Sequence, residues 1–343
     1  MMVVIIAPEY MVAKSSSDWV SAVASESCPA MQEHASKSGT RWTTTHAFYA
    51  NMGGFLVHGM NCHLTLDEFT CFPFAANSAQ LCVLLSSGII GKLPSITEDQ
   101  INDKSKEDVV VKILALLQVF QLVVQLIVRK VYGLPTSQLE ITALSFCVGA
   151  AFTYLLWLRR PKDIQLPTDV YITWDLNDAD KEQLCFLNGI SYFKTALLNN
   201  DHASPKRYIP NDFYNTEAVL RPSHSSSGRP HIFIQTGEDI GFAVGGLIFG
   251  VFHCLAWNFV FPTLIEQTLW RVASAFTSAS VPLFYIIWYI GPLFGINLRT
   301  LLLRVFFPQY IVCRLLIMVE AVRSLFFLPP GAFISTWSVN IPH

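Results

Sequence analysis

Three glutamines and one histidine inside long apolar segments are the residues of this sequence best placed to do chemistry within a membrane. Gln118, Gln121 and Gln125 follow one another at spacings of three and four residues, so they share one face of a helix. His253 lies in a later apolar segment, and its imidazole can gain or lose a proton near neutral pH. Because polar groups in hydrocarbon need hydrogen-bond partners, the pattern indicates either the lining of a path for a substrate or ion, or hydrogen bonds that join neighbouring helices.

The stretch RWTTTHAFYANMGGFLVHGM, residues 41–60, is a second place where polar side chains interrupt an apolar segment. Its apolar part is about fourteen residues long, which is short for a membrane span and typical of a buried or re-entrant helix. We therefore predict a short membrane or re-entrant helix over 41–60. Its polar residues His46 and Asn51 are expected to approach His253 and to form an intramembrane polar site with it.

Glycines four residues apart predict where helices pack closely. The segment GFAVGGLIFGVFHCLAW repeats this spacing twice, and small residues at such a spacing let another backbone approach. The paired glycines of 41–60 are suited to the same contact, so we expect that short helix to dock against this segment. The glycines expected in this packing are Gly241, Gly245, Gly246 and Gly250 in the segment, and Gly53 and Gly54 in the short helix.

Two further groups of residues have the types that bind metal ions, but their spacing favours simpler interpretations. Carboxylates could bind Mg²⁺, yet an acidic run just before a helix is more commonly a cap and a solvated turn. Histidine and cysteine could bind a transition metal, yet the spacing here follows no zinc pattern. We predict neither a metal site nor a cofactor. The acidic group is Asp175, Asp178 and Asp180, and the other is His58, Cys62 and His63 with Asp67 and Glu68 nearby.

Charged residues also occur in and just after the last apolar run, 301–319. Glu320 and Arg323 are three residues apart and can pair on one helical face. We interpret them as structural, together with Arg314, because long side chains near the end of a span can reach the interface.

The composition identifies the solvent that these segments need. Of the 343 residues, 52% are hydrophobic and only 14% are charged, against about 25% charged in soluble domains. The excess lies in runs long enough to cross a bilayer core of about 30 Å, so the chain is predicted to be a multi-pass membrane protein with the lipid bilayer as its partner. A net charge of −2 gives no reason to expect nucleic acid. The five runs are 109–128, 139–158, 240–261, 272–298 and 301–319.

The predicted fold class is all-α, a polytopic transmembrane helix bundle with five spans, a short N-terminal membrane helix and a cytosolic loop region. The long loop carries an amphipathic helix over 180–198 and could bind a protein partner. The predicted parts are a disordered N-terminal arm, 1–40; the short helix, 41–60; a cytosolic segment, 61–108; a transmembrane helix pair, 109–158; the cytosolic loop, 159–239; a transmembrane three-helix region, 240–328; and a C-terminal tail, 329–343.

Charge and cysteine content predict the sidedness and the redox state. Six Lys and Arg residues near the span ends on one side, against four on the other, place 61–108 and 159–239 in the cytosol. The eight cysteines include no C-x-x-C pair, so we expect free thiols. The N-terminus has no basic region before its apolar run, so a cleaved signal peptide is not expected. The membrane is an endomembrane or the plasma membrane.

Several strings resemble a known group of proteins. They are RWTTTHAFYANMGGF, ITEDQINDKSKED, GLPTSQLE, FHCLAWNFVFPT and the closing RSLFFLPPGAF…W…IPH. They are similar to an uncharacterised family of multi-pass integral membrane proteins from filamentous fungi, and the likeness extends from about residue 41 to the C-terminus. The resemblance implies a common membrane fold and a fungal source, and it implies no activity.

Three functions are compatible with these patterns. The first is a non-enzymatic accessory, scaffold or sensor component, which agrees with the lack of familiar catalytic motifs such as G-x-S-x-G or a Walker A loop. The second is an integral-membrane enzyme, such as an isoprenoid cyclase of a fungal secondary-metabolite pathway, although no acid is placed within a span to donate a proton. The third is a small-solute transporter or channel that uses the glutamines and His253.

Overall fold

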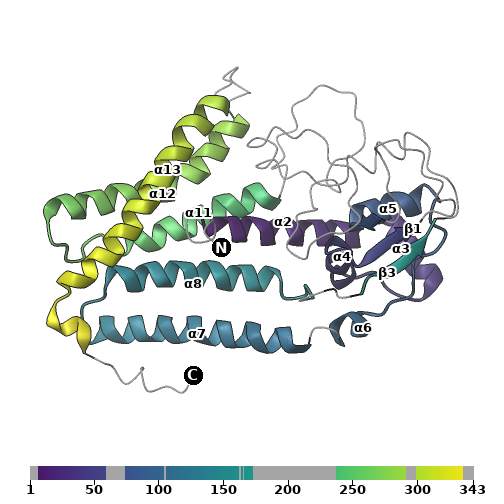
Figure 1. The fold of residues 1–343 in the computed structure, drawn as a ribbon, viewed down its shortest axis with the longest axis horizontal. Coiled ribbons are helices and arrows are strands. Elements are labelled where there is room, and N and C mark those ends of the chain that lie inside the picture. Colours follow the sequence, from purple (N-terminus) through teal and green to yellow (C-terminus); the bar gives the residue numbers. More distant parts are fainter. Residues whose placement is uncertain are drawn as a thin grey trace.

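The computed structural model describes residues 7–58, 74–103, 106–161, 164, 166–172, 237–290 and 299–334. Long helices form an elongated bundle, and a smaller unit that combines short helices with a sheet lies at one end of it (Figure 1). We call this smaller unit the head. The head contains α3 (Pro29–Ser38), α4 (Thr44–Asn51), α5 (Ser78–Ser86) and α6 (Glu98–Asp103), with strands β1 (Phe55–His58), β2 (Phe74–Ala76) and β3 (Thr168–Tyr171).

The bundle supports the assignment of a membrane protein. Four of the described helical segments are long and apolar enough to span a membrane: Ile113–Val131, Gln138–Leu156, Gly237–Cys254 and Arg304–Phe327. The first three lie in α7 (Lys106–Val131), α8 (Gln138–Leu156) and α11 (Gly237–Cys254). The fourth lies in α13 (Arg299–Arg323) and in the 3₁₀ turn η3 (Ser324–Phe327) that continues it. A second 3₁₀ turn, η4 (Pro330–Phe333), follows. The predicted run 272–298 lies partly in α12 (Leu264–Ile290), which is not one of these four, and partly outside the described residues.

The N-terminal segment is part of the bundle. Residues 1–40 were predicted to be a disordered arm, and this is wrong, because the described part forms α2 (Glu9–Glu26) and α3. α2 lies alongside α11 (Figure 1), with most of its serines buried. Small serine side chains allow close helix packing and can bond their own helix, as Ser15 Oγ does by donating to the Val12 carbonyl at 3.0 Å. A composition that indicates disorder in water therefore builds a packed helix here.

The glycines of α11 contact two helices on opposite sides. A Cβ atom at Gly241 would overlap the Ala13 Cα of α2, and one at Gly245 would lie 2.9 Å from the Glu9 Cβ of the same helix. A Cβ at Gly246 would lie 2.9 Å from the Val281 Cβ of α12, and one at Gly250 would overlap the Ser278 backbone. The four glycines of α11 therefore lie at close helix contacts, but the neighbours are α2 and α12 and not the glycines of residues 41–60.

Adding one methyl group at these contacts should be costly. Gly250→Ala forces α11 away from the Ser278 backbone, and we expect a loss of about 1–3 kcal/mol of unfolding free energy. Gly149→Ala in α8 is the matched control, because its new Cβ meets only Val12 Cγ2 at 4.0 Å. The control should be neutral or stabilising by roughly 0.5–1 kcal/mol, as alanine is the better helix former. Unfolding in mixed detergent micelles measures both; equal effects would contradict the packing.

Most of the described chain is helical, as predicted, but the head also contains a small sheet, so the fold is not all-α. The strand order is β2-β1-β3, with β1 antiparallel to β2 and parallel to β3. The described part of the stretch 41–60, up to His58, forms α4 and β1 within this head and not a membrane or re-entrant helix. The helix stops because the chain turns at Gly53, where φ is +87°, and Gly54 lies against the Tyr49 ring with no room for a Cβ.

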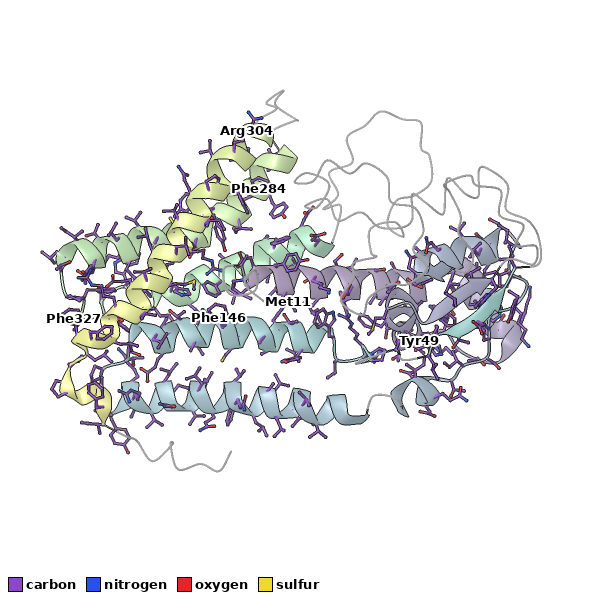
Figure 2. All side chains as sticks on the ribbon, viewed as in Figure 1. Met11, Tyr49, Phe146, Phe284, Arg304 and Phe327 are labelled. Carbon is purple, nitrogen blue, oxygen red and sulfur yellow. A yellow bond between two sulfur atoms is a disulfide. The ribbon has the colours of Figure 1, made fainter. Side chains whose placement is uncertain are left out.

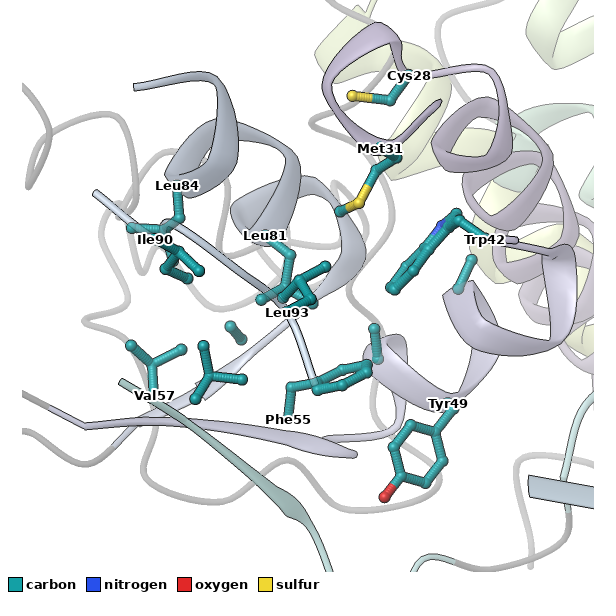
Figure 3. Close-up of a cluster of buried hydrophobic side chains, with 14 of the residues drawn as sticks. Cys28, Met31, Trp42, Tyr49, Phe55, Val57, Leu81, Leu84, Ile90 and Leu93 are labelled. Atoms are coloured by element: carbon teal, nitrogen blue, oxygen red, sulfur yellow. The ribbon is translucent and has the colours of Figure 1, made fainter. Parts of the chain in front are cut away.

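The hydrophobic core of the head explains why that stretch is apolar. Trp42, Tyr49 and Phe55 are at most 6% exposed, and the rings of Tyr49 and Phe55 pack edge to face with their centroids 5.3 Å apart. Figure 3 shows these rings with Leu81 and Leu93 around them. Most apolar residues between Trp42 and Val57 are therefore buried by other parts of the protein.

A disulfide joins two helices of the head. Cys28, just before α3, is bonded to Cys82 of α5, with the Cα atoms 6.7 Å apart. The expectation of free thiols is therefore wrong for this pair, which are distant in sequence and close only in the folded head. Cys147, Cys254 and Cys313 are free.

Several predictions fall outside the described residues. These are the amphipathic helix at 180–198, most of the loop 159–239 with its partner site, the acidic group Asp175, Asp178 and Asp180, and Cys62, His63, Asp67 and Glu68. The described part of that loop contributes β3 to the head.

Candidate functional site

A buried ion pair lies inside the bundle, between the N-terminal helix and the last span. Arg314 Nη2 of α13 donates to Glu9 Oε2 of α2 at 2.5 Å, and both side chains are 3% exposed. The Tyr310 hydroxyl donates to the other carboxylate oxygen at 2.5 Å. Both oxygens of the Glu9 carboxylate are thus bonded by groups from α13. A carboxylate away from water requires such partners to be tolerated.

Three helices position this pair. Tyr310 and Arg314 are four residues apart in α13, so they project from the same face. Gly245 of α11 lets the first turn of α2 approach closely enough to bring Glu9 to them. The Arg314 guanidinium also lies over the Phe249 ring of α11, 3.4 Å from its centroid, where the ring face attracts a cation. We call Glu9, Phe249, Tyr310 and Arg314 the bundle cluster.

His253 adjoins the bundle cluster. It is fully buried and stacks on Phe249 with the ring centroids 4.5 Å apart. Its Nδ1 is 2.6 Å from the Phe249 carbonyl, a contact that requires the proton on Nδ1. The Trp270 indole N–H of α12 donates to the His253 carbonyl at 3.1 Å. His253 therefore joins α11 to α12 and lines one side of the cluster.

The bundle cluster and the helices around it retain hydrogen-bonding capacity. Arg314 Nε, His253 Nε2 and Ser274 Oγ are buried without a hydrogen-bond partner in the described part of the chain. Ser274 lies on α12 one turn after Trp270, which contacts His253. A carboxylate, a guanidinium, a phenol and an imidazole thus meet in the interior of the bundle. Such groups can serve as proton relays or can hold helices together.

A second ionic cluster lies where α2 passes from the bundle to the head. Arg160 Nη1 donates to Asp18 Oδ2 at 3.1 Å, and the Trp157 indole N–H donates to the same oxygen at 3.0 Å. The Arg160 guanidinium stacks over the Trp157 ring at 4.3 Å. Burial raises the pKa of the Asp18 carboxyl, against the opposing effects of Arg160 and Lys14. These contacts attach α2 to the end of α8.

The structure does not bring the predicted site residues together. His46 Nε2 donates to the Ile96 carbonyl at 2.9 Å, and Asn51 donates to Ser21 Oγ at 3.2 Å and accepts from the Ser78 N–H at 2.9 Å. Both side chains hold the head together, whereas His253 lies in the bundle. The prediction that His46 or Asn51 approaches His253 is wrong, because 41–60 is not a membrane helix.

The glutamines are also separate from His253. They lie on α7, whose principal neighbour in the described bundle is α8, at the edge of the bundle in Figure 1. Gln118 is exposed, and Gln121 and Gln125 are half-buried. A single polar site that combines the glutamines with His253 is therefore not formed.

Two further residues named in the sequence analysis have ionic partners in the described part of the chain. Arg323 forms its ion pair with Glu266 of α12 and not with Glu320, because α12 brings an acidic residue to the same end of the bundle. His58 forms a pair with Asp169 of β3, with Nε2 2.7 Å from Oδ1. Among the described residues no group of three possible metal ligands occurs.

Glu9 and Tyr310 were not selected from the sequence as site residues. The available signal was Arg314 in the middle of an apolar run, because a cation in hydrocarbon requires an anion. Glu9, which interrupts the apolar start of the chain, is the anion, but 305 positions separate the two residues. Only the helix packing shows that they meet.

One comparison with known proteins gives a match. The model of a family of unknown function (DUF8562) matches residues 1–217. The match includes Glu9, Asp18, the disulfide cysteines, α7 and α8, and it ends before α11. No curated protein and no solved structure matches the chain.

Proposed function

We propose that this chain, which belongs to a family of unknown function (DUF8562), is a non-enzymatic accessory or sensor protein of a membrane. In this proposal the head is the part that meets a partner or a signal, and the bundle anchors the head and responds to it. The coupling element between them is α2.

The path of α2 is the observation that carries the proposal. This continuous 18-residue helix places Glu9 in the bundle cluster and Asp18 at the junction between the bundle and the head. Its last turns belong to the head, where Ser21 accepts from Asn51 and Ser25 Oγ accepts from the Trp42 indole at 3.1 Å. A helix bonded at both ends transmits a displacement of one unit to the other, because its own backbone bonds resist bending.

An enzyme is the second candidate, and Glu9 is the observation that favours it. A carboxylate walled by Tyr310 and Phe249 is the kind of acid that a membrane cyclase would need. However, Glu9 is held in an ion pair with Arg314, and an ionised carboxylate has no proton to donate. The arrangement therefore supports a lock between helices better than a general acid.

The transporter interpretation has less support. It depends on the glutamines and His253 lining one path. His253 contacts Phe249 and Trp270, while the glutamines lie on α7 beside α8.

Hydrogen exchange of the full chain in lipid nanodiscs tests the coupling. Glu9→Gln weakens the bundle end of α2, and we expect faster amide exchange in α4, through the contact between Ser21 and Asn51. Thr142→Val is the matched control, since Thr142 is a buried polar residue of α8 that bonds only its own helix, at the Gln138 carbonyl. The proposal would be contradicted if Glu9→Gln changed amide exchange only in the bundle. It would also be contradicted if both variants changed amide exchange in the head equally.

A further inference from the structure

The glutamines of α7 belong to a longer repeat. Leu114, Gln118, Gln121 and Gln125 follow one another at spacings of four, three and four residues, and Val111 and Val128 extend the alternation at both ends. This is the a/d spacing of a heptad, the pattern by which two helices pack side by side in a left-handed pair. The repeat from Val111 to Val128 is about 27 Å long, close to the thickness of a bilayer core. We call it the α7 seam.

The α7 seam is open along the half that is nearer to the head. Val111 and Leu114 are each 49% exposed, and Gln118 is exposed as well. Towards the other end Gln121, Gln125 and Val128 are half-buried. Figure 2 shows side chains projecting from α7 on the side away from α8. The described helices of this chain therefore leave the head-side half of the seam uncovered.

Lipid is a poor cover for this surface. Gln118 lies within the candidate span Ile113–Val131, five residues from its start, so its amide is at hydrocarbon depth. An amide there loses its hydrogen bonds to water and gains none from lipid tails, whereas a second helix can supply them. Leucine and valine alone would be stable against lipid, so Gln118 is the residue that requires a partner.

We propose that the occupant is the α7 of a second copy of this chain, in a parallel pair about an axis normal to the membrane. In such a pair each seam residue meets its own copy. Glutamine suits this arrangement, because its amide is both donor and acceptor and can bond to an identical amide. A lysine or glutamate at the same position would repel its copy. A polar residue at an a position also specifies the register and number of helices.

Cysteine crosslinking of the full chain in membranes tests the contact. Leu114→Cys lies on the seam and should give an oxidative dimer. Ile127→Cys is the control, because Ile127 is similarly exposed at 57% but is nine residues from Gln118 and therefore half a helical turn away on the surface. A crosslink at 114 and none at 127 supports the pair; crosslinks at both or at neither overturn it.

The role of the amides is tested separately in lipid nanodiscs or dilute bilayers. Replacing Gln118, Gln121 and Gln125 together by leucine keeps the helix apolar and foldable, and should weaken dimerisation by about tenfold or more. The fold is monitored by the protection of the Cys28–Cys82 disulfide from reductant, which the variant should retain. The proposal would be overturned if a folded variant dimerised as the wild type does, or if the wild-type chain were monomeric. A dimer in which position 114 does not lie at the contact would also overturn it.

Discussion

Replacing Glu9 by leucine should destabilise the protein by about 3–5 kcal/mol, because it leaves the Arg314 guanidinium buried without an anion. Arg314 is 2% exposed, so it cannot recover water without opening the bundle. Arg314→Leu should have a similar effect through the stranded carboxylate. Tyr310→Phe removes one hydrogen bond to the carboxylate and should lower stability less, by about 1.5–3 kcal/mol.

The double variant distinguishes an ion pair from two independent packing sites. Glu9→Leu with Arg314→Leu removes both charges, so its loss should be smaller than the sum of the single losses, and smaller than either one if the leucines pack well. Unfolding free energies of the full chain in mixed micelles give all three numbers. Additive losses would show that the two residues do not interact.

Replacing both disulfide cysteines by serine should be the second large effect, about 2–4 kcal/mol. The bond between Cys28 and Cys82 closes a loop with a sequence separation of 54, so its loss returns considerable freedom to the unfolded chain. The head should lose its structure first, since the bond joins α3 to α5, and the bundle helices should persist. A reductant titration of the wild type provides the same comparison without substitution; a head whose stability does not change would contradict it.

The disulfide also predicts which side of the membrane the head occupies. Such bonds form and persist in oxidising compartments, so we expect the head in a lumen or outside the cell, opposite to the side given by the Lys and Arg count. Two residues in that count, Arg159 and Arg160, bond Thr44 and Asp18 within the protein, so their presence has a structural cause. A glycosylation sequon inserted between Ser87 and Gly88, at the end of α5, should be glycosylated in cells. An insertion that stays unglycosylated would contradict this sidedness.

The sequence was sufficient for what depends on local pattern. Long apolar runs predicted the four candidate membrane spans, and the spacing of Gly246 and Gly250 predicted close packing. Predictions from the sequence were wrong where the same residue type acts differently in lipid and in water. The serines before residue 26 indicated a solvated arm but pack α2 into the bundle. The apolar character of 41–60 indicated a membrane helix, whereas two glycines end that helix and direct the chain into a strand.

The pairing of residues far apart in the chain could not be predicted from the sequence, for a physical reason. The ion pair of Glu9 with Arg314, and the disulfide of Cys28 with Cys82, each join residues that no helical or strand period relates. The position of Arg314 indicates that it needs an anion, but several carboxylates could supply it. Which one does depends on how α2 packs against the glycines of α11.

The central claim is that α2 lies inside the bundle and continues into the head, and the proximity of Tyr10 to Phe242 tests it most directly. Their ring centroids are 6.2 Å apart. With the other cysteines except Cys28 and Cys82 replaced by serine, Tyr10→Cys with Phe242→Cys should form an intramolecular crosslink in native membranes. Tyr10→Cys with Phe120→Cys, on the exposed side of α7, should form none. If the cysteine introduced at position 10 fails to crosslink with position 242 and reacts freely with a water-soluble maleimide, the N-terminal helix lies outside the bundle, and the account is contradicted.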